Sequence, residues 1–185
     1  MIMAIYLMGL SSCNNQITPV SEDKVREDIR TAFGVNDNDI KLNDLSLESV
    51  TVDGEVSIAK ATITIEKPVA ISILDVTVSY TVSKNKWVYD KVQYEFVSAV
   101  TKQEPDPQLA KVLITEMEQK KEGLYSFFDP DKYMTVIDTV ADRNNGTVIF
   151  TFQADYEKLH TQVTGTVQVK GTYRYDTGWT FAVED

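Results

Sequence analysis

The feature that most constrains this sequence is one pattern of structural signals that occurs twice. Each copy begins with an amphipathic helix signal and continues with four strand signals. We predict helices over 21–33 and 106–122, because each begins at a capping residue, Ser21 or Asp106, and is followed by a glycine. The order α-β-β-β-β, twice, predicts an α+β fold of two tandem helix-plus-four-stranded antiparallel sheet repeats that pack together.

The strand signals are runs in which apolar and polar residues alternate, as a sheet with one buried face requires. The predicted strands cover 45–52, 55–66, 69–82 and 86–97 in the first copy and 133–141, 147–156, 161–175 and 178–183 in the second. The apolar phase slips between Ile58 and Ala61, which predicts a β-bulge there. The dipeptides Asp53-Gly54 and Asn145-Gly146 predict two-residue type I′ hairpins.

The spacing of landmarks in the two copies indicates a duplication. The same offset separates Gly54 from Gly146 and Trp87 from Trp179, and the alternative is a single sheet with unrelated halves. The polar segment 98–105 ends in proline, so we place a first unit at 21–100 and a second at 106–185. A unit of about 80 residues buries too little surface to be more than marginally stable alone, so we expect the two units to pack on each other.

The first twelve residues are mostly apolar and carry no charge, and they are followed directly by the single cysteine, Cys13. At about 1.5 Å per residue they are too short to cross a hydrocarbon core of about 30 Å. The sequence Leu-Ser-Ser-Cys at positions 10–13 resembles the lipobox of a bacterial lipoprotein signal peptide, although no basic residue precedes the apolar run. The alternative is a buried N-terminal strand or helix with an incidental cysteine.

The lipoprotein resemblance implies that 1–12 is a signal peptide, that Cys13 is lipidated on sulfur, and that 13–20 is a tether. It places the chain in the bacterial cell envelope, held by acyl chains on the extracytoplasmic side of a membrane. The order of elements in the two units is itself similar to cystatin-like folds and to the tandem units of β-lactamase-inhibitor-type secreted proteins. That second resemblance is one of element order and carries little about function.

Charge and composition exclude several classes of function. The chain has 28 acidic and 18 basic residues, a net charge of −10, which argues against nucleic acid and against an anionic membrane surface as partners. One cysteine excludes a disulfide framework and a multi-cysteine metal site, and the one histidine, His160, is interpreted as a solvated turn residue. Phosphate-binding glycine loops are absent from the sequence, so we expect no cofactor.

Two acidic features of the sequence are candidate sites. The stretch 37–48 carries acidic residues near EF-hand spacing, but Lys41 and Leu42 stand where a ligand and the turn glycine are needed, which leaves at most a weak, irregular calcium site. Asp75 lies within an apolar run. It is either a buried acid with a raised pKa or, as we favour, a residue at a bulge or on the outward face of a strand.

The segment 124–133 is unusually aromatic, whereas the first copy is polar at the same place. These side chains therefore either fill the interface between the units or present an apolar patch to a ligand or partner. The candidate binding residues are Tyr125, Phe127, Phe128 and Tyr133.

These observations predict a membrane-anchored binding or interaction lipoprotein that recognises a protein, a peptide or a small apolar ligand and is not an enzyme. One alternative is an envelope structural or assembly factor without a ligand pocket. The other is a carboxylate-dependent hydrolase or isomerase, which needs a concave pocket of roughly 300 Å³ or more with an acid inside, such as Asp75.

Overall fold

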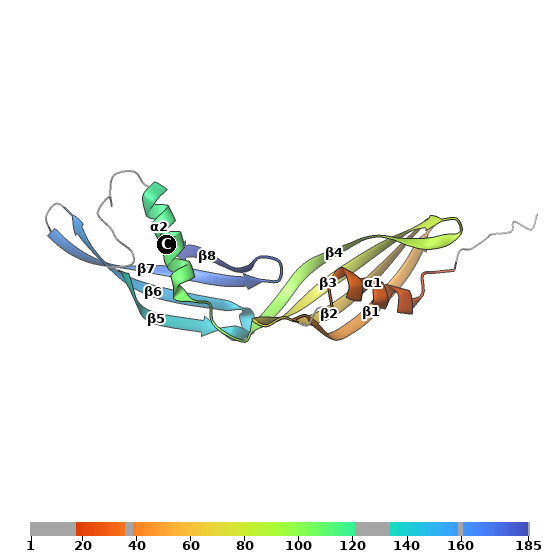
Figure 1. The fold of residues 1–185 in the computed structure, drawn as a ribbon, viewed down its shortest axis with the longest axis horizontal. Coiled ribbons are helices and arrows are strands. Elements are labelled where there is room, and N and C mark those ends of the chain that lie inside the picture. The colour runs from red at the N-terminus through yellow and green to blue at the C-terminus, as the bar shows by residue number, and fades with distance from the viewer. Residues whose placement is uncertain (1–17, 36–38, 121–133, 159–160, 185) are drawn as a thin grey trace, which may run out of the picture.

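The computed structural model describes residues 18–35, 39–120, 134–158 and 161–184. The elements in chain order are α1 (Glu22–Ala32), β1 (Lys41–Asp53), β2 (Val56–Glu66), β3 (Ala70–Ser83), β4 (Lys86–Thr101), α2 (Pro107–Lys120), β5 (Met134–Asp142), the 3₁₀ turn η1 (Arg143–Asn145), β6 (Thr147–Lys158), β7 (Thr161–Arg174) and β8 (Gly178–Glu184). The strands form two four-stranded antiparallel sheets, ordered β1-β2-β3-β4 and β5-β6-β7-β8 (Figure 1). An α+β chain with two antiparallel sheet units is therefore confirmed.

Helix α1 begins where the sequence provides a cap and buries one stripe of its surface. The backbone N–H of Lys24 donates to the Ser21 side chain at 3.4 Å, which satisfies one of the free amides of the first turn. Val25 and Ile29, one turn apart, are fully buried. They share a core with the inward-facing residues of β2 and β3, which are Ala59, Ala61, Ile63, Ile65, Leu74, Val76, Val78 and Tyr80.

Helix α2 contacts the second sheet in a similar way. Asp106 accepts a hydrogen bond from the backbone N–H of Gln108 at 2.9 Å, and Pro107 occupies the first helical position, where its missing N–H costs nothing. Ala110 and Ile114 are buried in a second core. Their partners from the sheet are Met134, Val148, Phe150, Phe152 and Val169. Each described helix thus contributes to the core of the sheet that follows it in the chain.

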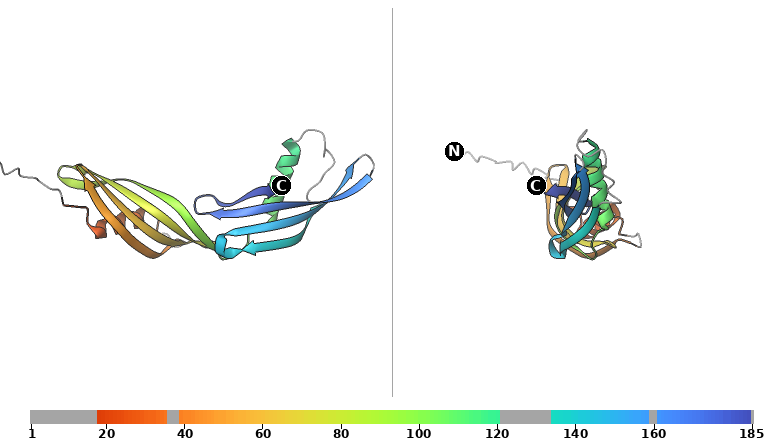
Figure 2. Two further views of the ribbon diagram at one scale, coloured as in Figure 1. Left: turned by 180° about the vertical axis from the view of Figure 1, so that it is seen from behind. Right: turned by 90° about the vertical axis from the view of Figure 1, so that its left-hand side faces the viewer.

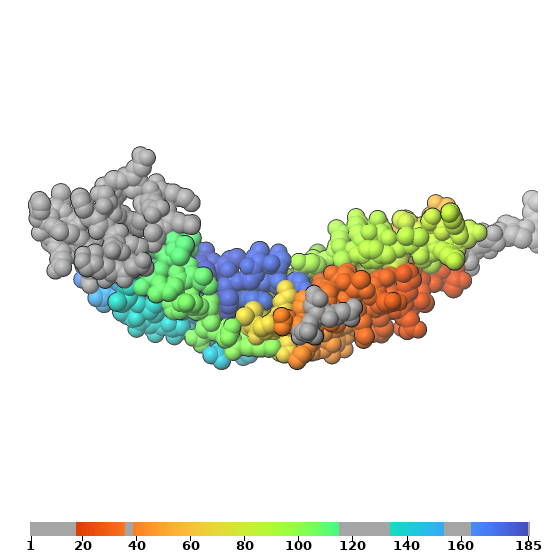
Figure 3. Space-filling model, viewed as in Figure 1, coloured from red at the N-terminus to blue at the C-terminus, as the bar shows by residue number. Residues whose placement is uncertain are grey.

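The two units contact each other at their ends and not along their faces, as two views of the ribbon agree (Figures 1 and 2). The space-filling view shows an elongated, bent outline in which the surface of β7 and β8 meets the first unit near the middle (Figure 3). The buried core of this junction is small and consists of Ala70, Ala99 and Tyr173. The packing between the units is therefore much less extensive than we expected.

The bulge predicted in the strand after Asp53 is wrong. Strand β2 pairs with β3 without a shift in register, and Ser57 and Ala59 face the core while Ile58 is 37% exposed on the outer face. The bulges lie on β1, where Asn43 and Glu48 are extra residues, and also on β4 and β5. Edge strands tolerate an extra residue because one side of the strand has no ladder to interrupt.

The two predicted hairpin turns also differ from the prediction. Gly54 and Gly146 have positive φ angles of 58° and 61°, but their neighbours do not, so neither turn is type I′. The two-residue loop with positive φ at both positions is Lys84-Asn85, which joins β3 to β4 with φ of 50° and 60°. Gly146 instead ends η1 in the left-handed region.

Within the described part of the chain, no helix combines the length and the apolar character that crossing a bilayer requires.

Candidate functional site

Of the residues that the sequence singled out as chemically interesting, the structure describes Asp75 and most of the acidic stretch 37–48, which belongs to β1 from Lys41 onward. Cys13, His160 and the four aromatic residues Tyr125, Phe127, Phe128 and Tyr133 lie outside the described residues, so these predictions stay predictions. Asp75 is described and lies on the exposed face of β3 that points away from α1. The favoured interpretation, an outward-facing acid, is therefore confirmed for Asp75.

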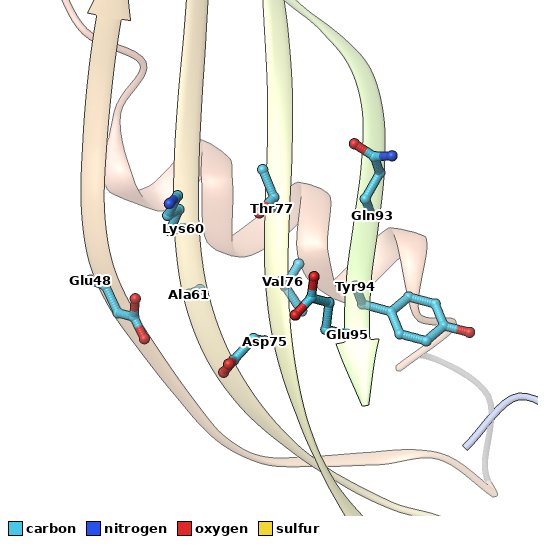
Figure 4. Close-up of a pocket in the computed structure, with 9 residues that line it drawn as sticks. All are labelled: Glu48, Lys60, Ala61, Asp75, Val76, Thr77, Gln93, Tyr94 and Glu95. Atoms are coloured by element: carbon cyan, nitrogen blue, oxygen red, sulfur yellow. The ribbon is translucent and has the colours of Figure 1, made fainter. Parts of the chain in front are cut away.

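Asp75 takes part in a hollow of about 470 Å³ on the face of the first sheet that α1 leaves uncovered (Figure 4). The hollow is open to solvent, and the side chains that lie on this face of the sheet are polar and carry both signs of charge, whereas Ala61, Val76 and Tyr94 direct their side chains to the α1 face. The lining residues are Glu48, Lys60, Ala61, Asp75, Val76, Thr77, Gln93, Tyr94 and Glu95.

Strand register places the polar side chains of the hollow in two neighbouring rows. Lys60 pairs with Thr77, and Thr77 pairs with Gln93, which gives the first row across β2, β3 and β4. In the next row, Asp75 lies between Thr62 and Glu95. Side chains two residues apart on a strand lie on the same face, so both rows point to the side opposite α1.

A bulge brings the remaining carboxylate into the hollow. Glu48 is the extra residue of β1 between Leu47 and Ser49, and bulges of this kind redirect a side chain. The Glu48 carboxylate oxygen Oε1 lies 2.8 Å from the Thr62 hydroxyl, and Asp75 Oδ1 lies 2.9 Å from the same hydroxyl. A hydroxyl carries one proton, so Thr62 donates to one of these two carboxylates at a time. The three side chains therefore offer more acceptors than donors.

The electrostatics of the hollow follow from its lining. Three carboxylates, of Glu48, Asp75 and Glu95, face a single ammonium group, that of Lys60. All four residues are exposed, and within the described residues no group of three or more histidine, cysteine, aspartate or glutamate side chains could hold a metal ion. The arrangement is suited to accepting hydrogen bonds from a polar or basic group that approaches the sheet face.

The face of the same sheet that α1 covers carries a polar cluster of Tyr80, Asp28 and Lys24. Tyr80 is fully buried under α1, and burial raises the pKa of its hydroxyl, with the neighbouring Asp28 carboxylate raising it further. The Lys24 ammonium lies 3.1 Å from Asp28 and screens the carboxylate from the solvent side. Tyr80 belongs to the first core, so these side chains lie where α1 packs on the sheet.

The hollow was not recognised in the sequence, although a signal for it exists. Three consecutive strands each carry a polar pair at i and i+2, namely Lys60 and Thr62, Asp75 and Thr77, and Gln93 and Glu95. Polar pairs at this spacing are typical of any solvated sheet face, so they become a site only when register aligns them. Glu48 belongs to no such polar pair, because the β1 bulge determines the face of the sheet on which its side chain lies.

Comparison of the chain with models of protein families, with curated proteins and with solved structures finds no match. The resemblance to cystatin-like and β-lactamase-inhibitor-type units therefore stays an expectation from the order of elements.

Proposed function

We propose that this chain is a lipid-anchored binding protein of the bacterial cell envelope that recognises a protein or peptide. In this proposal Cys13 carries the lipid, residues 13–20 form the tether, and the two sheet units lie in water on the extracytoplasmic side. The observation that supports recognition most directly is the polar hollow of about 470 Å³ on the uncovered face of the first sheet.

The chemistry of the hollow favours a polar and basic partner over a small apolar ligand. Small apolar ligands bind in pockets that are enclosed and lined mostly by hydrophobic side chains, whereas Glu48, Asp75 and Glu95 line an open face. The net charge of the chain is −10, which attracts a basic partner and accelerates its encounter. Backbone amides and the side chains of lysine or arginine supply the donors that the surplus acceptors need.

Binding fits this hollow better than carboxylate catalysis does. A hydrolase or isomerase uses an acid in a site that excludes water, so that the electrostatic interactions of the acid are strengthened. Asp75 lies in a hollow large enough for a small substrate, but its side chain is exposed on an open sheet face. We therefore assign Asp75 a role in recognition.

The aromatic segment belongs to the same proposal as a second contact region. Tyr125, Phe127, Phe128 and Tyr133 are concentrated in a short stretch of the second copy with no counterpart in the first. Aromatic side chains bring large contact area with few rotatable bonds and are enriched at interfaces. We propose that they add apolar contacts to the polar ones of the hollow.

The test of the hollow is a capture experiment with isosteric variants that remove charge and keep shape. The variant combines Glu48→Gln, Asp75→Asn and Glu95→Gln in the full chain with Cys13→Ser. Quantitative mass spectrometry compares the envelope proteins and peptides that it and the parent chain retain. We expect a partner whose capture falls by about tenfold or more, because loss of charged hydrogen bonds at an interface costs about 2–5 kcal/mol. Unchanged capture would remove the hollow from the proposal.

The matched control changes the net charge by the same amount at exposed carboxylates outside the hollow. It combines Glu27→Gln, Glu55→Gln and Asp90→Asn, all at exposed positions. Capture of the same partner by this control at the level of the parent shows that the hollow, and not net charge, is responsible. An equal loss in both variants would show that the attraction is non-specific.

Lipid attachment needs a separate measurement. The chain expressed in bacteria with residues 1–13 intact is labelled with an alkyne fatty acid, and membrane and soluble fractions are compared with those of Cys13→Ser. We expect label and membrane association in the parent and neither in the variant. A labelled Cys13→Ser chain, or an unlabelled parent, would contradict the anchoring proposal.

A second candidate function is a structural or assembly factor, and the end-to-end arrangement of the units favours it. An elongated chain held at one end can keep two envelope components at a fixed separation without a ligand pocket (Figure 1). Both candidates are compatible with duplication of one ancestral unit, which we also propose. Gly54 lies in the turn before β2, and Gly146 lies in the turn before β6. Trp87 and Trp179 are each the second residue of the last strand of a unit.

A further inference from the structure

The turn between β7 and β8 of the second unit reaches across the junction to aromatic residues of the first. The Tyr175 ring lies 6.0 Å from the ring of Phe33, at the end of α1, and 5.7 Å from that of Tyr94 on β4. Phe33 and Tyr94 are themselves 5.7 Å apart, so the three rings contact one another in tilted and edge-on pairs. Aromatic pairs in these geometries are attractive beyond the area they bury.

Lys67, in the turn between β2 and β3, also contacts Tyr175. Its ammonium nitrogen donates to the Tyr175 backbone carbonyl at 3.1 Å and lies 3.7 Å from the centre of the Tyr175 ring. Burial lowers the pKa of Lys67, while the nearby Asp176 carboxylate acts in the opposite direction. One residue of the second unit is thus bound by three residues of the first.

The rest of the junction consists of a few contacts, among them the Arg174 guanidinium, which lies 5.6 Å from the centre of the Phe96 ring. Tyr173 packs against Ala70 and Ala99, and a Cβ atom at Gly146 would lie 3.3 Å from the Ala99 carbonyl oxygen. The covalent link between β4 and α2 is the segment 102–106, in which the backbone N–H of Lys102 donates to the Val69 carbonyl at 2.9 Å, so that residues 103–106 connect the two units. Domains joined through small interfaces move relative to each other unless specific contacts prevent it.

We infer that Tyr175 is a latch that fixes the angle between the two units, and that its release lets the second unit rotate relative to the first about residues 103–106. The latch residues are Phe33, Lys67, Tyr94 and Tyr175. Each unit has a separate core, built around α1 or α2, so release of the latch leaves both units folded. The inference concerns the shape of the molecule and does not depend on the proposed binding function.

The side chains of the latch are placed for reversible release. Tyr94 is 39% exposed, and Tyr175 is half-buried, so water reaches both rings once they separate. Burial raises the pKa of the Tyr175 hydroxyl above the ordinary tyrosine value. Phe33 is buried in the first core and stays with it, so the contact opens by movement of the Tyr175 ring away from Phe33 and Tyr94, without unfolding of the elements around it.

The test measures the distance distribution between the two units by pulsed electron paramagnetic resonance. Spin labels are attached at Asp90→Cys in β4 and Thr166→Cys in β7, both exposed positions, in the full chain with Cys13→Ser. We expect a single narrow distribution in this parent. Tyr175→Ala should broaden the distribution about two-fold and shift its mean, because the remaining interface is small. A distribution as narrow as that of the parent, with both units folded by circular dichroism, would overturn the inference.

The control removes a tyrosine from an aromatic pair that lies within one unit. The Tyr89 ring makes an edge-on contact with Tyr80 at 6.3 Å, both in the first unit, so Tyr89→Ala should leave the distribution narrow. If Tyr175→Ala unfolds the second unit, Lys67→Ala decides the question from the first unit. A broadened distribution in Lys67→Ala supports the latch, and an unchanged one refutes it.

Discussion

Replacing Ile29 by alanine tests whether α1 is part of the first core. Ile29 is fully buried between α1 and the sheet. The substitution removes three carbon atoms, which at about 0.8 kcal/mol per buried CH₂ is about 2.4 kcal/mol. The cavity left behind brings the expected loss in unfolding free energy to about 2–5 kcal/mol. A unit of this size has only about 4–12 kcal/mol in total, so the effect should be large.

The assay is urea unfolding followed by tryptophan fluorescence, because each unit holds one tryptophan. With Trp179→Phe, the remaining Trp87 reports on the first unit, and with Trp87→Phe, Trp179 reports on the second. A loss of about 3 kcal/mol should move the Trp87 midpoint by about 1–3 M urea. Ile114→Ala, in α2, should produce a comparable loss in the Trp179 transition, since Ile114 is also buried.

Val97→Ala is the control, because Val97 is 54% exposed in β4 and should change the same midpoint little. An Ile29→Ala midpoint equal to that of this control would show that α1 does not belong to the core. A shift of both tryptophan transitions together would instead show that the two units unfold as one.

Two further substitutions test packing and charge. A Cβ atom at Gly171 would lie 2.8 Å from Val148, which is buried, and 2.9 Å from the Phe181 ring. Gly171→Ala should therefore lower the unfolding free energy of the second unit by about 1–3 kcal/mol. An unchanged Trp179 transition would contradict this packing. The side-chain hydrogen bond from Lys102 is the main cause that lowers the pKa of Glu66 below its ordinary value of 4.5. The Glu66 contribution to stability is therefore complete above about pH 4.5 and is lost as the pH falls through the lower pKa of the folded state. The midpoint of Glu66→Gln should accordingly fall less than that of the parent between about pH 6 and pH 3, and parallel falls would refute the assignment.

The positions of helices and strands could be predicted because local chemistry determines them. Ser21 and Asp106 cap their helices as expected from the free amides of a first turn. The strands begin and end within a few residues of the predicted bounds, except that β1 begins earlier and β4 ends later. Both of these strands carry bulges, and the extra residues let the pairing continue past the point where the alternation of the sequence changes phase.

Which residues of a strand face the core and which face solvent was less predictable. Hydrophobicity favours Ile58 as a core residue, yet Ile58 is outward and Ser57 is fully buried. The Ser57 hydroxyl donates to the Thr51 carbonyl at 3.0 Å, which removes the cost of burying it. Because β2 pairs with β3 in a single register, the same alternation holds along the whole strand. The apolar run Ala59, Ala61 and Ile63 therefore determines which β2 residues face the core.

The candidate site could not be predicted, because it depends on register across four strands. Glu48, Asp75 and Glu95 are far apart in the sequence, and although the sequence draws attention to Asp75 and to the acidic stretch that holds Glu48, only the aligned strands show that the three share one face. The end-to-end junction was missed for a related reason. Tyr175 and Lys67 meet through a cross-unit contact that no local pattern encodes.

The bulges have a consequence for how this chain behaves among copies of itself. Every register shift in the described sheets places its extra residue on an edge strand, β1, β4 or β5, and the remaining edge strand, β8, has only seven residues. An interrupted edge is a poor template for another strand, because its free amides and carbonyls no longer form a regular row. The bulges therefore disfavour fibre formation by a protein made so largely of strands. Deleting an extra residue such as Glu48 should make the β1 edge regular and increase association between copies of the chain.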